Sequence, residues 1–223
     1  MSDRILAKIL EILGNTREID MYPAGDELAE AILRGIDAGL TEANEWRLGR
    51  NTRIMLALRA MGLGAQIETV VELLTWKDFE SFVAYILSEN GFRCVESFRR
   101  RGNESVKGME IDVVGVRGHI VIAADAKMWG ARNNKSSALK TAAENQKERT
   151  RRLTEMMDKL EEKIGGLEKR TYSLFPILVT WLVEEVQIHD GVPIVPVFKL
   201  NSFMLNLDNY WDLMISFDMS WSS

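Results

Sequence analysis

The spacing of apolar positions divides the chain into a first third that is predicted to be helical and a mixed remainder. Apolar side chains at helical spacing form two stripes before residue 40, and two further helices are expected over residues 51–61 and 65–74. A turn joins these last two helices, as in a helix-turn-helix motif, but the second carries Glu68 and Glu72 and no Arg or Lys. Residues 1–74 are therefore predicted to be an all-helical extension, acting as a cap or a dimerisation element.

A helix that begins at Thr75 opens the second predicted region, residues 75–223. Asp78 stands three positions after Thr75, which is a variant of the capping box found at helix starts. Glu80 lies on the flank of the apolar stripe of this helix, about 100° from Phe79 around the helix axis. From the sequence alone, Glu80 can equally face solvent or reach the edge of a neighbouring sheet.

The most informative pattern is a predicted β-hairpin within residues 108–129. Two apolar, β-branched runs flank a short Arg117-Gly118 break, as in two strands joined by a tight turn. Three charged side chains interrupt these runs: Asp112, Asp125 and Lys127. Because an unpaired buried ion costs several kcal/mol, these charges require partners, and a divalent metal is a natural one.

The spacing of these charges can be tested by counting residues. Alternate residues of a strand share a face, so Asp125 and Lys127 point the same way, roughly 7 Å apart. A two-residue turn at Gly118-His119 places Asp112 directly opposite Asp125. A turn at Arg117-Gly118 shifts Asp112 by one pair but keeps it on that face, whereas a three-residue loop without a bulge moves it to the other face.

The basic residues concentrate around this hairpin although the whole chain is acidic. The net charge is −5, but residues 76–171 carry 19 basic and 15 acidic side chains. Positive charge near a candidate acidic site is what phosphate binding requires. We interpret Arg99, Arg100 and Arg101, which precede the hairpin in a predicted loop, as contacts to phosphate groups.

A long helix running from Ser136 towards Ile164 is expected to follow the hairpin. Gln146 and Thr150 interrupt its apolar stripe, and a buried amide needs partners. Gln146 is predicted either to approach the acidic site or to be a core glutamine bonded to backbone. Five basic side chains are predicted on the outer helix faces, where some contact a nucleic-acid backbone: Lys140, Lys147, Arg149, Arg151 and Arg152. Lys135, in the loop before the helix, is a further predicted DNA contact.

The order of these features resembles the PD-(D/E)XK nuclease superfamily, particularly its archaeal restriction-endonuclease-like (Mrr-like) and Holliday-junction-resolvase-like branch. The resemblance rests on a helix with Glu80, then Glu110-Ile111-Asp112, then Asp125-Ala126-Lys127, then a long helix. It covers the chain from about Trp76 onward. Two positions depart from the family pattern, because Ile111 replaces the proline and Asp125 replaces the commoner glutamate.

This resemblance implies an α/β (α+β) fold with a restriction-endonuclease-like mixed central sheet flanked by helices, and a Mg²⁺-dependent DNA endonuclease. Asp112, Asp125, the carbonyl of Ala126 and Glu80 would hold Mg²⁺, for which Mn²⁺ would substitute. Lys127 would orient or deprotonate the attacking water, and Gln146 would assist. The alternatives are a catalytically inactive DNA-binding or assembly subunit with this fold, and a purely structural ion cluster.

Cutting both strands of a duplex, or resolving a branched DNA symmetrically, requires two active sites, so we expect a homodimer. Apolar side chains near the C-terminus would supply its interface: Trp211, Met214, Phe217, Met219 and Trp221. The alternative is a monomer that nicks one strand, with its aromatic tail folded over its own core.

Composition excludes other classes of protein. No apolar run approaches the ~20 residues that span a bilayer, so no membrane contact is expected and a cytoplasmic location is the default. The single Cys94 has no partner for an internal disulfide, and with only two histidines a Cys/His zinc site is excluded.

Overall fold

The computed structural model describes residues 2–102, 108–128, 135–181, 184 and 187–221. The chain forms two compact units, residues 1–82 and 83–223. The boundary lies inside a helix, α5 (Trp76–Glu89), and so falls later than the predicted boundary at residue 74. The predicted fold class, a mixed sheet flanked by helices, is confirmed for the second unit.

The first unit combines helices with a small antiparallel sheet of strand order β1-β3-β2. Besides the first part of α5, its elements are α1 (Ser2–Asn15), β1 (Met21–Pro23), α2 (Glu27–Arg34), β2 (Gly39–Leu40), β3 (Glu45–Arg47), α3 (Arg50–Gly62) and α4 (Ile67–Glu72).

The prediction that residues 1–74 are all-helical is therefore wrong. Tyr22 of β1 pairs with Trp46 of β3, and the two side chains are 4% and 2% exposed. Burying two large aromatic side chains on one face stabilises strands that are too short to show an alternating pattern in sequence. The guanidinium of Arg34 lies 5.2 Å from the Trp46 ring centroid, which closes this small core with a cation–π contact.

A buried arginine links α3 to the start of α5 within the first unit. Arg53 is 1% exposed, and its Nε donates a hydrogen bond to Asp78 Oδ2 at 2.9 Å. Its other nitrogens donate to Thr16 Oγ1 and to the carbonyls of Leu13 and Leu73. Asp78 Oδ2 also accepts a hydrogen bond from the backbone N–H of Thr75, and Thr75 Oγ1 accepts one from the backbone N–H of Asp78. The predicted capping box is therefore confirmed.

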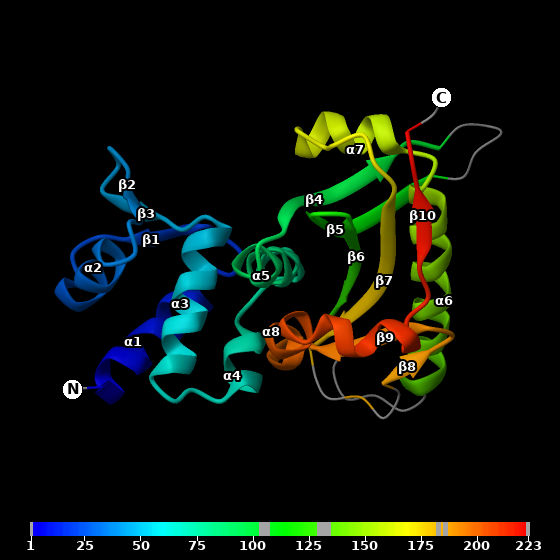
Figure 1. The fold of residues 1–223 in the computed structure, drawn as a ribbon. Helices are drawn as coiled ribbons and strands as arrows, with labels where there is room; N and C mark the ends of the chain where they lie inside the picture. Colours follow the sequence, from blue (N-terminus) through cyan, green and yellow to red (C-terminus); the bar gives the residue numbers. More distant parts are fainter. Residues whose placement is uncertain (1, 103–107, 129–134, 182–183, 185–186, 222–223) are drawn as a thin grey trace. The chain divides into compact units, whose positions relative to one another are not determined.

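The second unit is built on a seven-stranded mixed sheet of order β4-β5-β6-β7-β9-β8, with β10 paired to β7 (Figure 1). Strands β6, β7 and β9 are mutually parallel, and the other pairs are antiparallel. Its strands are β4 (Arg93–Arg100), β5 (Met109–Arg117), β6 (Ile120–Lys127), β7 (Tyr172–Thr180), β8 (Ile188–His189), β9 (Val192–Pro196) and β10 (Phe217–Met219).

The predicted hairpin is formed by β5 and β6, and its register is settled. Arg117 pairs with Ile120 and Val113 pairs with Ala124, so the two-residue turn is Gly118-His119. Gly118 has a φ of 59°, a left-handed conformation that such tight turns require and that glycine adopts without strain. This is the register in which Asp112 and Asp125 are opposite each other.

The sheet is covered by helices on both sides. Helix α6 (Lys135–Leu153) packs along β5, β6, β7 and β9, while α8 (Val197–Leu205) packs on the other side of β7 and β9 (Figure 1). The long helix predicted towards Ile164 is divided: α6 ends at Leu153, and α7 (Met157–Ile164) turns towards β4. Apolar side chains on both sides of this break share one core cluster.

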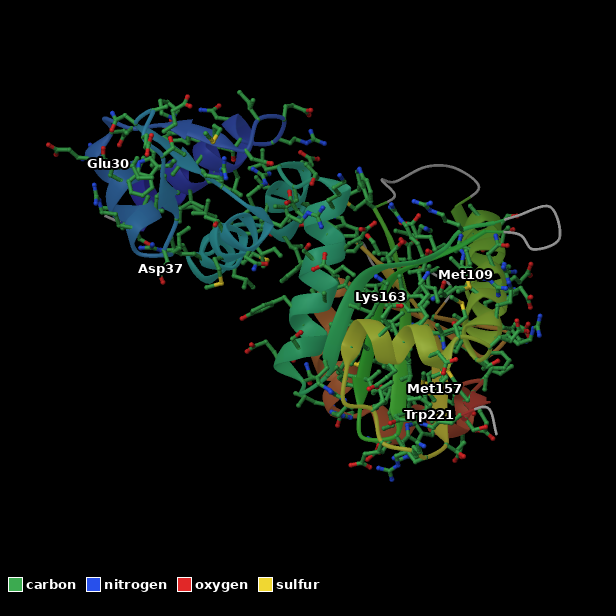
Figure 2. All side chains as sticks on the ribbon, turned by 90° about the horizontal axis from the view of Figure 1, so that it is seen from above. Glu30, Asp37, Met109, Met157, Lys163 and Trp221 are labelled. Atoms are coloured by element: carbon green, nitrogen blue, oxygen red, sulfur yellow. The ribbon has the colours of Figure 1, made fainter. Side chains whose placement is uncertain are left out.

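The C-terminal tail packs against its own chain. After η1 (Leu207–Leu213), a 3₁₀-helix, Met219 of β10 is 1% exposed and Met214 is 8% exposed. Trp221 and Phe217 pack against the cluster that contains Met157 of α7, and Met157 and Trp221 lie together in Figure 2. Among the apolar tail residues from which a dimer interface was expected, only Trp211, at 38% exposure, ranks as an exposed large hydrophobic side chain.

None of the described helices has the length and apolar character that crossing a bilayer requires.

The buried Arg53–Asp78 pair gives a prediction about stability. Arg53→Met should lower the free energy of unfolding by about 3–5 kcal/mol, because the Asp78 carboxylate then stays buried without its counter-ion. Denaturant unfolding monitored by tryptophan fluorescence measures the change. The matched control is Arg17→Met on the exposed surface of the same unit, expected within about 0.5 kcal/mol of the parent. Equal effects of the two substitutions would contradict a structural role for this pair.

Candidate functional site

The carboxylates of Asp112 and Asp125 lie at one end of the β5–β6 hairpin. The described pairing ends at Val113 and Ala124, so the two aspartates are the next residues on adjacent strands. Asp112 Oδ2 accepts a hydrogen bond from the backbone N–H of Ala126 at 2.8 Å. The Asp125 side chain is 1% exposed, whereas Asp112 is only partly buried. The N–H of Ala126 thus contacts Asp112, while its carbonyl stays a predicted metal ligand.

Two cations hold the buried carboxylate of Asp125. Arg149 of α6 donates a hydrogen bond from Nη1 to Oδ1 at 2.7 Å, and Lys127 Nζ lies 2.7 Å from Oδ2. The Lys127 ammonium is within ion-pair distance but does not approach at a hydrogen-bonding angle, so Oδ2 has no hydrogen bond from a described donor. We treat the contact as an ion pair, because Coulomb attraction depends on distance more than on direction.

The environment raises the pKa of the Asp112 carboxyl from its usual value to about 6. Partial burial away from water is the largest cause, and the nearby negative charge of Asp125 is the next. The hydrogen bond from Ala126 and the charges of Lys127 and Arg149 oppose the shift without cancelling it. Close to neutral pH, this site therefore holds two carboxylates that repel each other.

Asp125, but not Asp112, lines a cavity of about 340 Å³ between β6 and α6. Asp125, Lys127 and Arg149 line it, together with Asn145 and three small residues of α6. A larger groove of about 890 Å³ lies between the ends of β4 and β5 and the same helix. Arg149 and Asn145 line both, so the two spaces share a wall; Met109, which also lines the groove, lies beside α6 in Figure 2.

The larger groove is lined by six arginines and three glutamates: Arg99, Arg100, Arg101, Arg149, Arg151, Arg152, Glu110, Glu148 and Glu155. Arg99 lies 2.7 Å from Glu110, and Arg151 forms two hydrogen bonds to Glu148. The lining side chains carry a net charge of +3 when all are ionised. The three arginines predicted as phosphate contacts do line this groove, although Arg99 and Arg100 belong to β4 and not to a loop.

Gln146 packs against β6 and does not line the cavity at Asp125. Its side chain is fully buried, and its Nε2 donates a hydrogen bond to the carbonyl of Ala123 at 2.8 Å. Its Oε1 has no hydrogen bond from a described donor. Of the two roles left open by the sequence, the structure shows the contact to backbone, two residues before Asp125.

The remaining predicted site residues are not part of this arrangement. Glu80 is buried on the part of α5 that belongs to the first unit, whereas Asp112 and Asp125 belong to the second. Lys140 is exposed, and Lys147 pairs with Asp190 at 2.6 Å; neither residue lines the two cavities. The prediction for Lys135 concerns a side chain outside the described part of the chain.

Arg149 was predicted on the outer face of its helix, whereas its guanidinium contacts Asp125. A signal was available, because Arg149 is about 60° from Gln146 and about 40° from Leu153 around a helix of 3.6 residues per turn. Both neighbours lie on the buried stripe, so Arg149 was on its flank, as Glu80 was on the flank of α5. Whether a side chain on the flank faces the core or the solvent depends on the strand that packs against the helix. Here the Asp125 carboxylate on β6 draws the Arg149 side chain towards the core.

The carboxylates of Asp112 and Asp125 suit a metal cation that needs few protein ligands. No cluster of three or more His, Cys, Asp and Glu side chains able to hold a metal occurs among the described residues. Two carboxylates are nevertheless what a Mg²⁺ site commonly uses, since this ion retains several waters. The buried Asp125 Oδ2 accepts no hydrogen bond from a described donor, and a metal ion could share it with the Lys127 ammonium, which lies 2.7 Å away. The residues present therefore fit Mg²⁺ through Asp112 and Asp125.

Comparisons with known proteins give no functional assignment. No family model matches the sequence. The chain is 29% identical over 137 residues to an uncharacterized protein of Archaeoglobus fulgidus, an alignment covering 61% of this chain and 95% of that relative.

Two solved structures are weakly similar. They are protein VC1899 from Vibrio cholerae (14% identity, TM-score 0.34) and Can2 from Sulfobacillus thermosulfidooxidans in complex with cyclic tetra-adenylate (9% identity, TM-score 0.33). The alignments cover 95% and 93% of this chain, which spans about half the length of each (52% and 51%). At these scores neither structure carries an argument about this protein.

The raised pKa of Asp112 predicts how pH affects stability. Above pH 6 the folded protein must ionise Asp112 in an unfavourable site, whereas the unfolded chain ionises it freely from about pH 4. Asp112→Asn removes this penalty, so the variant should gain about 1–3 kcal/mol relative to the parent between pH 4 and pH 8. Denaturant unfolding of both proteins without divalent metal, across this pH range, gives the difference.

The exposed Asp218 provides the matched control, because Asp218→Asn should stay within about 0.5 kcal/mol of the parent throughout. A pH-independent difference for Asp112→Asn would show that its carboxyl has an ordinary environment.

Proposed function

We propose that this protein is a Mg²⁺-dependent endonuclease that hydrolyses phosphodiester bonds of DNA at Asp112, Asp125 and Lys127. The observation that supports this most is that the cavity at Asp125 and the arginine-lined groove share the lining residues Asn145 and Arg149. A phosphodiester backbone in the groove would lie beside the carboxylates, which by themselves repel it. A cation bound by Asp112 and Asp125 removes that repulsion, and Arg149, in the shared wall, belongs to both regions.

Asp112 and Asp125 are the residues that would hold Mg²⁺, with Mn²⁺ as a substitute. When bound, the ion lowers the pKa of a water and offsets negative charge on the phosphate. Asp112 is held by the Ala126 N–H, and Asp125 is fixed on the rigid central strand β6. Both carboxylates are therefore positioned before any ligand arrives, which spares the site the entropy of ordering them.

Lys127 supplies a positive charge at the mouth of the acidic pair. It shares a strand face with Asp125, and its side chain is 25% exposed, so its ammonium contacts both the carboxylate and the cavity. In this position it would orient the attacking water and stabilise the negative charge that develops on phosphoryl oxygens in the transition state. Gln146 would act through β6, by fixing the carbonyl of Ala123.

The arginines of the groove would bind the flanking phosphates. Their planar guanidinium groups match phosphate geometry and can form two parallel hydrogen bonds. Because Arg99–Arg101 come from β4 and its end while Arg151 and Arg152 come from α6, the groove offers positive charge from two walls. Such contacts position a backbone without reading its sequence.

Two other functions are compatible with parts of this arrangement. A catalytically inactive DNA-binding or assembly subunit would use the groove alone, and a structural ion cluster would use the Arg149 and Lys127 pairs alone. Neither accounts for a cavity beside the buried Asp125 carboxylate that shares a wall with the basic groove. A homodimer that cuts both strands remains part of the proposal.

The proposal predicts that Asp125→Asn abolishes cleavage. The substitution keeps the side-chain volume but removes a charge needed to hold the cation, so the rate should fall at least about 100-fold. Conversion of supercoiled plasmid to nicked or linear DNA in Mg²⁺ measures it, with circular dichroism to check the fold. Binding of DNA without metal should be similar to the parent or slightly tighter, since one negative charge near the phosphate is lost.

The control is Asp190→Asn, the same chemical change in an exposed ion pair with Lys147 that lines neither cavity. It should cleave at the parent's rate. Activity of Asp125→Asn within severalfold of the parent would refute the assignment of the metal ligands.

The groove predicts the salt dependence of binding. Replacing Arg99, Arg100 and Arg101 together by Ala should weaken binding to DNA of any sequence, and each lost phosphate contact should reduce the slope of log K against log salt concentration by about 0.9. Fluorescence anisotropy over a range of KCl concentrations gives this slope.

A matched variant removes three basic side chains that do not line the groove, Lys163, Lys169 and Arg170, and should keep the parent's slope. If both triple variants show the parent's slope, the arginines at the end of β4 are not phosphate contacts.

A further inference from the structure

Arg149 has a position that the proposed nuclease mechanism does not explain. It is the one side chain that both contacts the buried Asp125 carboxylate and lines the arginine groove, among the described residues. Its side chain is 34% exposed, while the carboxylate that it contacts is 1% exposed. The guanidinium of Arg149 reaches inward to this carboxylate although the groove beside it is open to water. The attraction between the two charges therefore holds it there.

The charge balance of the site explains this arrangement. With Asp112 and Asp125 ionised, Lys127 and Arg149 bring the total to zero. Adding a divalent cation to the same carboxylates would bring the total to +2 in a partly buried space, which is unfavourable. If the guanidinium left Asp125, the total of the remaining groups would be +1, which one phosphodiester group would neutralise.

Arg149 is better placed to leave than Lys127. Lys127 follows Asp125 by two residues on the rigid strand β6, so the strand keeps its stem beside the carboxylate. Arg149 extends from a separate element, α6, along the wall between the cavity and the groove. A guanidinium keeps its charge in proteins and is repelled by a metal ion, so it relieves that repulsion only by moving.

We propose that Arg149 is an exchangeable counter-ion: it neutralises Asp125 in the metal-free protein, and a divalent cation displaces it into the groove, where it binds a phosphate of the nucleic acid. Metal binding and phosphate binding are coupled through this one side chain. The coupling is reciprocal, so the nucleic acid also strengthens metal binding. This inference rests on the proposed function, because it requires Asp125 to be a metal ligand.

The inference is tested with Mn²⁺ as the probe and no DNA present. Isothermal titration calorimetry of the full chain gives the Mn²⁺ dissociation constant for the parent and for Arg149→Gln. The variant has no cation to displace, so it should bind Mn²⁺ at least about fivefold more tightly. Arg149→Met, which keeps the apolar stem of the side chain, serves as a second variant, and thermal unfolding checks that both are folded.

The matched controls are Arg151→Gln and Arg152→Gln. Each removes the same charge from the same helix and groove, but neither residue lines the cavity at Asp125. Both should bind Mn²⁺ within about twofold of the parent. Equal tightening in all three arginine variants would attribute the effect to general charge repulsion and would overturn the exchange.

A second measurement follows the released side chain. Adding Ca²⁺, a divalent ion that also takes oxygen ligands, should strengthen DNA binding more in the parent than in Arg149→Gln, because only the parent gains a phosphate contact. Anisotropy with and without Ca²⁺ gives the two ratios. Equal ratios would overturn the phosphate contact.

The failures of the two ideas are distinguishable. Absence of Mn²⁺ binding in the parent and in both Arg149 variants would remove the metal site and the proposed function with it. Mn²⁺ binding in the parent that is unchanged or weaker in Arg149→Gln and Arg149→Met would leave the proposed function standing and overturn the exchange alone.

Discussion

The repulsion between two carboxylates at one end of a buried hairpin is the constraint on which the rest of this site depends. Asp112 and Asp125 follow directly after the last pair of the β5–β6 ladder, and the strands hold their backbones in place. Such a pair is tolerated only with protons or cations nearby. Near neutral pH the protein uses cations, since Asp125 contacts Lys127 and Arg149. Below pH 6 a proton also contributes, because the pKa of Asp112 is raised to about 6.

The proposal that this site is more than an inert ion cluster rests on the spaces beside the neutralised carboxylates. A buried ion pair adds little stability compared with apolar residues of similar size, so it is weak evidence for a purely structural role. Here Asp125 and its two counter-ions also line a cavity, and the cavity shares a wall with a groove of net positive charge. A fold that needed only to bury Asp125 would have no use for either space.

The sequence predicted those parts of the structure that follow from local rules. Residue counting along two strands left two registers, both with Asp112, Asp125 and Lys127 on one face, and the structure selects the turn at Gly118-His119. The capping box at Thr75 depends on residues three positions apart, and it was predicted for the same reason.

The parts that could not be predicted depend on contacts between distant segments. The strands at Tyr22 and Trp46 are three residues long and are stabilised by each other's side chains, so neither has a recognisable pattern alone. Arg149 lies on the flank of its helix, where the sequence allows either solvent or core, and only the opposite strand determines which. For long charged side chains, the position on the helix limits the possible environments but does not determine which one the side chain occupies.

The central claim is that Asp112 and Asp125 together hold a divalent cation. The most direct test is an anomalous diffraction measurement at the manganese edge on crystals grown with Mn²⁺. The account predicts an anomalous peak about 2–2.3 Å from oxygens of both carboxylates, with the guanidinium of Arg149 no longer on Asp125. Crystals without a peak at this position, in which Arg149 still contacts Asp125, would contradict it.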